Sequence, residues 1–206
     1  MRRRGLRRDL LRNQEGAALI EATMILPILL VLVFGLTELS LFLSQRHLAE
    51  KAVQLGLRRA VTSDTVAAGP GLSHDTSGGY WNGLPPGARC GLDASNPCPI
   101  LAVMCDVASG CTCRTARCGF TFSRAGLAPI LAAMNAVLPE LRPENLQVGY
   151  ETNGLGYVAR PGPVSVDVTI RLVGVTYRPI FLDLLFRAPI PLRVSGTLPS
   201  EDLVSD

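Results

Sequence analysis

The sequence predicts an α+β protein in which a long N-terminal helix, partly in a membrane, packs on a small antiparallel sheet. Three observations predict this class. Residues 17–43 are almost entirely apolar and long enough to cross a bilayer. The helical spacing of apolar residues continues to about residue 61. Residues 164–173 alternate between apolar and polar side chains, which is typical of a strand with one buried face. A chain of 206 residues has room for one ordinary domain beside such a helix.

The first 16 residues form a basic leader. They hold six arginines against Asp9 and Glu15, a net charge of +4, whereas the whole chain carries +3. The remainder is therefore close to neutral, with a net charge of −1. A nucleic-acid partner is not expected, because such proteins gather basic residues on the folded domain. The positive-inside rule instead places this leader in the cytoplasm.

Residues 17–43 predict a transmembrane helix. No charged residue occurs in 22–37, and residues 39–42 prolong the apolar run. About 20 apolar residues, at about 1.5 Å each, cross a hydrocarbon core about 30 Å thick. A helix is required, because lipid offers no partner to backbone N–H and C=O groups. A cleaved secretory signal is disfavoured, since the apolar run is too long and no small-x-small cleavage site follows it.

Three residues of this helix are unusual for a membrane span. Glu21 is a carboxylate near one end, and Glu38 lies 17 residues further on, about 25 Å along the axis. The two therefore sit near opposite faces of the bilayer, and Glu38 is interpreted as a tolerated interfacial carboxylate. Pro27 removes the hydrogen bond to the carbonyl of Thr23 and predicts a helix bend. We expect the Thr23 hydroxyl to help satisfy the disturbed turn, and the bend is either tolerated or used for packing.

The N-terminal quarter resembles the TadE-like family of tight-adherence pilus systems, whose N-termini are similar to those of type IV pilins. A basic leader ends at Gly16, and Glu21 is the fifth residue after it. The resemblance rests on four motifs and covers about residues 13–61. These are Gly16-Ala17-Ala18-Leu19-Ile20-Glu21, Ile25-Leu26-Pro27, Gly35-Leu36-Thr37-Glu38 and Gln54-Leu55-Gly56-Leu57-Arg58-Arg59-Ala60. Ala22 stands where related major pilins often have tyrosine, which favours a minor pilin or pseudopilin.

The resemblance implies processing and assembly. A prepilin peptidase would cut between Gly16 and Ala17, and Glu21 would then meet the new amine of a neighbouring subunit. The implied partners are other pilins or pseudopilins, the inner-membrane assembly platform, the peptidase and membrane lipid. The implied location is the bacterial inner membrane, with one span, a cytoplasmic N-terminus and a periplasmic domain. Whether the subunit enters the extracellular fibre or only primes it stays open.

Residues 44–64 extend the same helix beyond the membrane. Leu48, Ala52 and Leu55 recur at helical spacing and predict its buried face. Charged residues fall mostly on the other side of the helix. The sequence Thr62-Ser63-Asp64 predicts its exit.

Residues 65–125 predict a loop-rich segment held by disulfides. Glycine, proline and serine are frequent up to residue 89, and all six cysteines follow within 29 residues. Zinc is the alternative, but the gaps do not match paired ligands and no histidine is near, so no metal site is expected. An even number of cysteines in a short window suits an oxidising compartment, and 15 pairings are open. The cysteines are Cys90, Cys98, Cys105, Cys111, Cys113 and Cys118.

No motif predicts catalysis. His47 and His74 are the only histidines, and neither has the partners of a hydrolytic triad. A catalytic thiol is disfavoured for want of a base. We therefore predict no enzyme activity, no catalytic residue and no cofactor.

Residues 126–206 predict a helix followed by antiparallel strands. Residues 127–141 have the pattern of an amphipathic helix, and strands are expected at 146–150, 164–173 and 191–198. Asn153-Gly154 is turn chemistry between the first two strands, and Tyr157-Val158 is a candidate extension of that hairpin. The apolar residues 179–191 are expected to be a short helix packed on the core, the alternative being a membrane-proximal or partner surface.

Two rival functions stay open at this point. The first is an uncleaved single-span scaffold of the same machinery, which an intact leader would support. The second is a membrane-anchored periplasmic enzyme or sensor, which would keep activity without residues 1–43.

Overall fold

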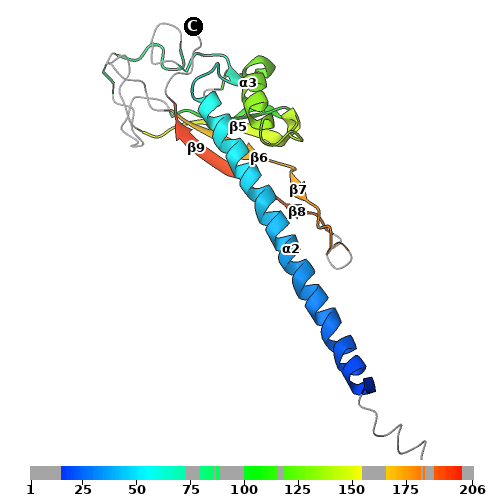
Figure 1. Cartoon of the computed structure of the whole chain (residues 1–206). Helices are drawn as coiled ribbons and strands as arrows, with labels where there is room; N and C mark the ends of the chain where they lie inside the picture. Colours follow the sequence, from blue (N-terminus) through cyan, green and yellow to red (C-terminus); the bar gives the residue numbers. More distant parts are fainter. Residues whose placement is uncertain are drawn as a thin grey trace, which may run out of the picture. The chain divides into compact units, whose positions relative to one another are not determined.

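The computed structural model describes residues 15–72, 79–85, 87–88, 100–115, 118–154, 166–181, 183 and 188–200. The chain divides into two compact units. One contains Met1–Leu43 with Arg178–Pro189, and the other contains Ser44–Tyr177 with Ile190–Asp206. The architecture is α+β, with one long apolar N-terminal helix and antiparallel sheets, as predicted (Figure 1).

The long helix α2 runs over Glu15–Ala60 without a break and contributes to both units. Its end agrees with the predicted exit. Arg58 and Arg59 stand in the last turn, where positive charge is favourable beside the unpaired carbonyls. The Thr62 hydroxyl donates a hydrogen bond to the Arg58 carbonyl (3.2 Å), which satisfies one of these groups.

A five-stranded antiparallel sheet forms the centre of the second unit, in the order β3-β2-β5-β6-β9. The predicted strands at 146–150 and 164–173 are found, paired with each other, and alternation buries every second residue of β6. The hairpin β2–β3 in the cysteine segment was not predicted. Tyr157-Val158 lies outside the described residues. The strands are β2 (Ala102–Asp106), β3 (Gly110–Cys113), β5 (Leu146–Thr152), β6 (Val166–Leu172) and β9 (Ser195–Pro199).

The outer half of α2 packs on this sheet and on the second helix, with glycines at the closest approaches. A Cβ added to Gly56 would lie 2.6 Å from Sδ of Met134 in the second helix and 3.2 Å from Cδ1 of Ile170 in β6. A glycine of the sheet also lies close to α2, since a Cβ on Gly196 of β9 would lie 2.7 Å from Leu57 Cδ1. The buried face predicted from Leu48, Ala52 and Leu55 was therefore only partly right. Leu48 is 38% exposed, because the side of the helix that faces the core carries other residues: Ala49, Ala52, Val53, Gly56, Leu57 and Ala60.

The second helix, α3, covers Arg124–Asn135 rather than the predicted 127–141. It begins earlier because the Ser123 hydroxyl caps it, accepting a hydrogen bond from the Gly126 amide (3.1 Å). After Asn135 the chain leaves the helix in turns and reaches the short 3-10 helix η1 (Pro143–Asn145). A small two-stranded sheet precedes α3, formed by β1 (Ala67–Ala68) and β4 (Thr121–Phe122).

A last hairpin joins β7 (Thr176–Tyr177) to β8 (Ile190–Pro191). The expectation that residues 179–191 pack in the core was wrong for its described large apolar residues, because Ile180, Phe181 and Ile190 are all exposed. Residues 178–189 group with the apolar part of α2 instead of the sheet. Leu184, Leu185 and Phe186 lie outside the described residues.

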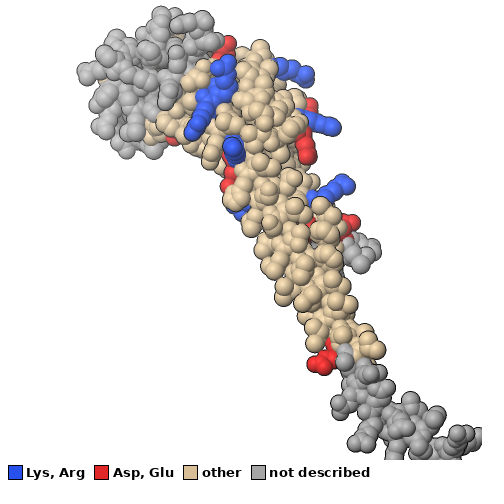
Figure 2. Space-filling view, viewed as in Figure 1, with Lys and Arg blue, Asp and Glu red and all other residues tan. Residues whose placement is uncertain are grey.

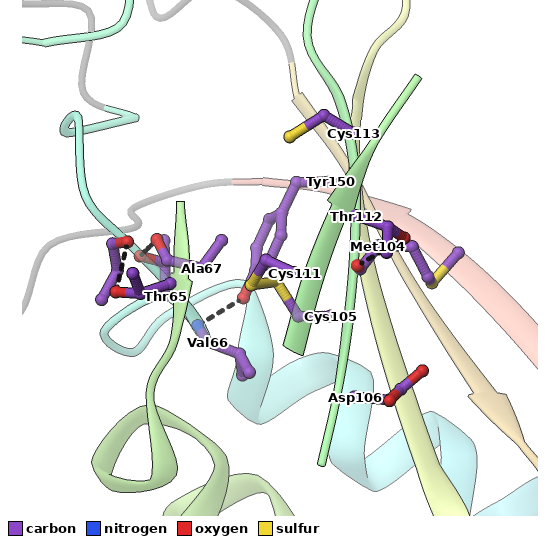
Figure 3. The surroundings of a disulfide bond; sticks show 12 residues. Thr65, Val66, Ala67, Met104, Cys105, Asp106, Cys111, Thr112, Cys113 and Tyr150 are labelled. Atoms are coloured by element: carbon purple, nitrogen blue, oxygen red, sulfur yellow. Dashed lines mark hydrogen bonds between the residues drawn. A yellow bond between two sulfur atoms is a disulfide. The ribbon is translucent and has the colours of Figure 1, made fainter. Parts of the chain in front are cut away.

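Disulfides hold the β2–β3 hairpin and the segment after it. Cys105 and Cys111 face each other in register across the two strands and are bonded, with Cys105 fully buried (Figure 3). A second bridge joins Cys113 to Cys118. The predicted disulfides are thus found for these four cysteines. Cys90 and Cys98 lie outside the described residues.

Removing the first bridge should lower stability. The double change Cys105→Ala and Cys111→Ala frees a loop of sequence separation 6, which predicts a loss of about 2 kcal/mol in the free energy of unfolding. Urea denaturation of the full chain in detergent, followed by Trp81 fluorescence, measures this. The matched change Cys113→Ala and Cys118→Ala opens a loop of similar length. It should cost less, because neither cysteine is fully buried. An unchanged unfolding midpoint for the first pair would contradict this prediction.

Tyr150 connects the sheet to the segment after α2. Its buried phenol oxygen accepts a hydrogen bond from the Val66 amide (2.9 Å), shown as a dashed line in Figure 3. Burial raises the pKa of Tyr150 to about 12 from its usual 10.0. The folded state therefore resists deprotonation, so this residue's contribution to stability is full below pH 10.0 and is lost as the pH rises towards 12.

The alkaline dependence gives a second prediction. Wild-type unfolding free energy should fall between about pH 10 and 12, and Tyr150→Phe should remove that part of the slope. At neutral pH the same variant should lose about 1–3 kcal/mol, because the buried Val66 N–H loses its acceptor. Denaturation curves at neutral and alkaline pH check both. Parallel pH profiles for the two proteins would contradict the assignment.

Candidate assembly site on the N-terminal helix

The first part of α2 presents a continuous apolar surface. Among the described residues, α2 is the one helix that is long and apolar enough to cross a membrane. Figure 2 shows uncharged surface along it, with an acidic group close to its start. The exposed large side chains on this stretch are Leu19, Ile20, Met24, Ile25, Leu26, Ile28, Leu29, Leu30, Val31, Leu32, Val33, Phe34, Leu36, Leu39, Leu41 and Leu43. A water-soluble protein does not leave such a surface uncovered, so the helix could span a membrane.

Glu21 interrupts this surface in the second turn of the helix. Its side chain is exposed, and it forms no hydrogen bond or ion pair with any residue that the structure describes. The nearest charged residue towards the C-terminal end of the helix is Glu38. An unpaired carboxylate in lipid costs about 2.5–3.5 kcal/mol at the bilayer centre and less near an interface. The position therefore calls for a cation that the described chain does not supply.

The predicted processing residues lie where the helix begins. Gly16 is exposed, and a Cβ added to it would meet nothing within 4 Å. Ala17 follows in the same first turn, so Glu21 comes one helical turn later, on the same face. Cleavage between Gly16 and Ala17 stays a prediction.

Pro27 does not end the helix, which continues through it to Ala60. The Thr23 hydroxyl donates to the Ile20 carbonyl at 2.8 Å. It therefore supports the turn before the one that Pro27 disturbs, and not the Thr23 carbonyl itself. The bend at Pro27 stays a prediction.

Glu38 has a role that the sequence did not reveal. The residue is only 5% exposed, and its carboxylate accepts hydrogen bonds from two backbone amides of the β7–β8 tip. The Ile180 amide lies 3.0 Å from Oε1 and 2.9 Å from Oε2, and the Phe181 amide lies 2.6 Å from Oε2. The Phe181 ring also stacks on Phe34, with centroids 5.1 Å apart and an interplanar angle of 11°. The interpretation of Glu38 as a merely tolerated carboxylate is thus incomplete, since it fixes a loop to the helix.

No sequence pattern could have predicted the contact between Glu38 and the Ile180 and Phe181 amides. Glu38 and the amides it binds are 142 and 143 residues apart. The apolar run at 179–191 predicted burial in the core of the sheet. Residues 178–189 are grouped with the apolar part of α2 instead, and Ile180 and Phe181 are therefore exposed.

This contact predicts slow amide exchange. Hydrogen bonds to a charged acceptor are worth about 1.5–3 kcal/mol, so Glu38→Ala should speed hydrogen exchange at Ile180 and Phe181 about ten- to a hundredfold. Glu38→Gln keeps one acceptor oxygen and should give an intermediate rate. Exchange of the full chain in detergent, read by mass spectrometry, tests this. Glu50→Ala is the matched control, because Glu50 pairs with Arg46 on the same helix. Equal rates in wild type and Glu38→Ala would rule out the contact.

The described residues outside α2 offer little for catalysis or metal binding. They hold no group of three or more histidine, cysteine, aspartate or glutamate side chains that could bind a metal ion. A shallow hollow of about 350 Å³ lies on the outer face of the sheet, lined by residues such as Met104, Arg114 and Glu151. The threonine hydroxyls that line it are hydrogen-bonded elsewhere, Thr112 to the Met104 carbonyl and Thr169 to Thr197.

Comparison with known families locates the recognisable part of the chain. The family model described as TadE-like protein matches residues 16–58, which confirms the resemblance predicted for the N-terminal quarter. No curated protein and no solved structure matches the chain. The matched family is structural rather than catalytic, and the match indicates a pilin-like protein associated with tight-adherence pili. The matched segment begins at Gly16 and lies entirely within α2.

Proposed function

We propose that this protein is a minor pilin or pseudopilin of a tight-adherence (type IVc-like) pilus assembly or secretion system. A prepilin peptidase removes the basic leader after Gly16, and the chain assembles through α2. Before assembly it resides in the bacterial inner membrane, with the leader in the cytoplasm and the sheet-bearing unit in the periplasm. After assembly it enters or primes an extracellular fibre. The other pilins and the inner-membrane assembly platform are its partners.

The contrast between the two glutamates of α2 carries this proposal. Glu38 finds its hydrogen-bond donors within its own chain, so its charge needs nothing from outside. Glu21 finds no donor or cation among the described residues, although it lies on a surface otherwise suited to lipid. Cleavage after Gly16 would create an α-amino group one turn away on every copy. Two charges that are each costly in lipid become tolerable when paired between neighbours.

The remaining surface of the helix suits packing between subunits. Apolar side chains cover it from Leu19 onward, and Gly35 offers a position where a Cβ would meet nothing within 4 Å. In a membrane, helices associate by close van der Waals packing and by polar contacts at few positions. Glu21 would then set the register while the apolar surface supplies most of the buried area.

The mass of the N-terminal peptide tests the proposal. Membranes from cells with a prepilin peptidase should contain a chain that begins at Ala17, and cells without the enzyme should contain the intact leader. The rival scaffold predicts an intact leader in both. An intact leader in cells with active peptidase and assembled pili would therefore overturn the processed-pilin assignment.

A further inference from the structure

We infer that the tip of the β7–β8 hairpin, centred on Ile180 and Phe181, is a second membrane contact that lies in the headgroup boundary of the outer leaflet. The inference rests on one part of the proposed function, namely that α2 spans the membrane. It does not depend on cleavage after Gly16 or on fibre assembly.

The tip is attached to α2 at a level inside the predicted span. Phe181 stacks on Phe34, and Glu38 binds the tip amides one turn further along. Phe34 is nine residues before Leu43, where the span is expected to end, a distance of about 13 Å along the axis. A helix that fills the bilayer between residues 17 and 43 must bring the tip to the level of lipid.

The tip also presents apolar side chains outward. Ile180 is 66% exposed and Phe181 remains 44% exposed despite its stacked ring. Two charged residues flank the pair, Arg178 before it and Asp183 after it, and both are exposed. An exposed charge on each side of the apolar pair opposes deep burial. Two exposed apolar side chains flanked by exposed charges fit the boundary between headgroups and acyl chains.

The hydrogen bonds to Glu38 make sense in such a place. A loop in water can leave its amides to the solvent, whereas a loop beside acyl chains must find partners for them within the protein. Glu38 supplies that acceptor to two successive amides, and they in turn stabilise a carboxylate within an apolar surface. These hydrogen bonds remove both the cost of unsatisfied amides beside lipid and the cost of an unpaired carboxylate there.

Lipid fits this surface better than a second protein does. A specific protein interface buries about 800 Å² on each partner, more than two apolar side chains can supply. A bilayer requires no such area, because the tip only extends a contact that the helix already makes. Leu30 and Leu41, one turn before and two turns after Phe34 on the helix, are also exposed and belong to the same compact unit as the tip.

Fluorescence quenching by brominated lipid tests the inference on the full chain in phosphatidylcholine vesicles. The native Trp81 is the only tryptophan and is fully buried, so it provides a constant background. Phe181→Trp adds an indole at the tip. We expect lipids brominated near the headgroup to quench most of the added emission, and lipids brominated near the chain end to quench less. Leu30→Trp is the positive control for the span, and Thr112→Trp, at the exposed position of strand β3, is the negative control.

The controls separate the possible failures. Quenching of Leu30→Trp without quenching of Phe181→Trp would overturn the inference and leave the membrane span intact. No quenching of Leu30→Trp would overturn the span and with it the proposed function. Protection of the Phe181→Trp indole that appears only at high protein-to-lipid ratio would identify a second copy as the occupant, which also contradicts the inference.

Discussion

Replacing Glu21 with alanine will leave the protein in the membrane but remove it from the assembled fibre. The variant loses the one exposed charge on the apolar surface of α2, so insertion is as favourable as before or more so. In the assembly, however, the amine of a processed neighbour is left in lipid without its partner. The loss is a few kcal/mol at each contact, so the fraction of subunit recovered in sheared fibres should fall at least about tenfold.

Two matched variants test whether the loss of charge pairing at Glu21 causes the defect. Glu21→Gln keeps the shape and the hydrogen-bonding oxygen but not the charge, and should fail nearly as severely if charge pairing is the cause. Glu50→Ala also removes one negative charge from α2 but lies outside the apolar stretch, and should assemble normally. Membrane and fibre fractions are compared by quantitative immunoblot. Normal amounts of Glu21→Ala in fibres would contradict the role given to this carboxylate.

Replacing Gly126 with alanine will destabilise the sheet-bearing unit, although alanine is the better helix former. The substitution gains about 1 kcal/mol of helix propensity. Its Cβ would lie 2.5 Å from the backbone oxygen of Thr65 and 2.9 Å from the carbonyl carbon, so α3 or the 64–65 backbone must move. A clash with backbone cannot be relieved by a rotamer change. We therefore expect a net loss of about 2–3 kcal/mol in the free energy of unfolding.

The matched control is Gly119→Ala. Its Cβ would lie 3.6 Å from Pro70 Cγ, an ordinary contact, so stability should change by no more than about 0.5 kcal/mol. Urea denaturation with Trp81 fluorescence compares the two variants. If Gly126→Ala proves as stable as the control, α3 does not approach residue 65 as closely as described.

The parts of the fold that the sequence predicts are those governed by local patterns. The apolar run and the helical spacing after it predicted α2 to within a few residues of its ends. Alternation predicted the buried face of β6, because one side of the strand must be covered by the core. Ser123 is a recognisable cap, and reading it would have placed the start of α3 correctly.

The parts that the sequence could not predict depend on distant contacts. The six cysteines indicated disulfides, but they indicated neither the pairing of Cys105 with Cys111 nor the strands that carry this pair, because short strands in a cysteine-rich segment resemble loops. The buried face of α2 combines Val53 and Leu57 with alanines and a glycine, and no hydrophobic spacing rule selects those small residues over Leu48. Glu38 and the hairpin tip are separated by most of the chain, so their contact followed from neither pattern alone.

The candidate site also has a part that the sequence predicts and a part that only the structure shows. Glu21, Gly16 and Ala17 are recognisable from a local motif, and the family match covers that part of the helix. What distinguishes Glu21 from Glu38 required the structure, since only the burial and hydrogen bonding of Glu38 show that it is satisfied internally. The central claim therefore concerns where Glu21 finds its cation.

A zero-length cross-link tests that claim most directly. Fibres assembled from a mixture of isotopically heavy and light subunits are treated with a lipid-soluble carbodiimide, which joins a carboxylate to an amine only when the two are in contact. We predict a peptide in which Glu21 of this chain is bonded to the α-amine of a neighbouring subunit, either the Ala17 amine of a copy with the other isotope label or the N-terminal amine of another pilin, and absent from Glu21→Gln fibres or membranes. Processed fibres that yield no such peptide between subunits, while other carboxylate–amine contacts in the same sample are joined, would contradict the account.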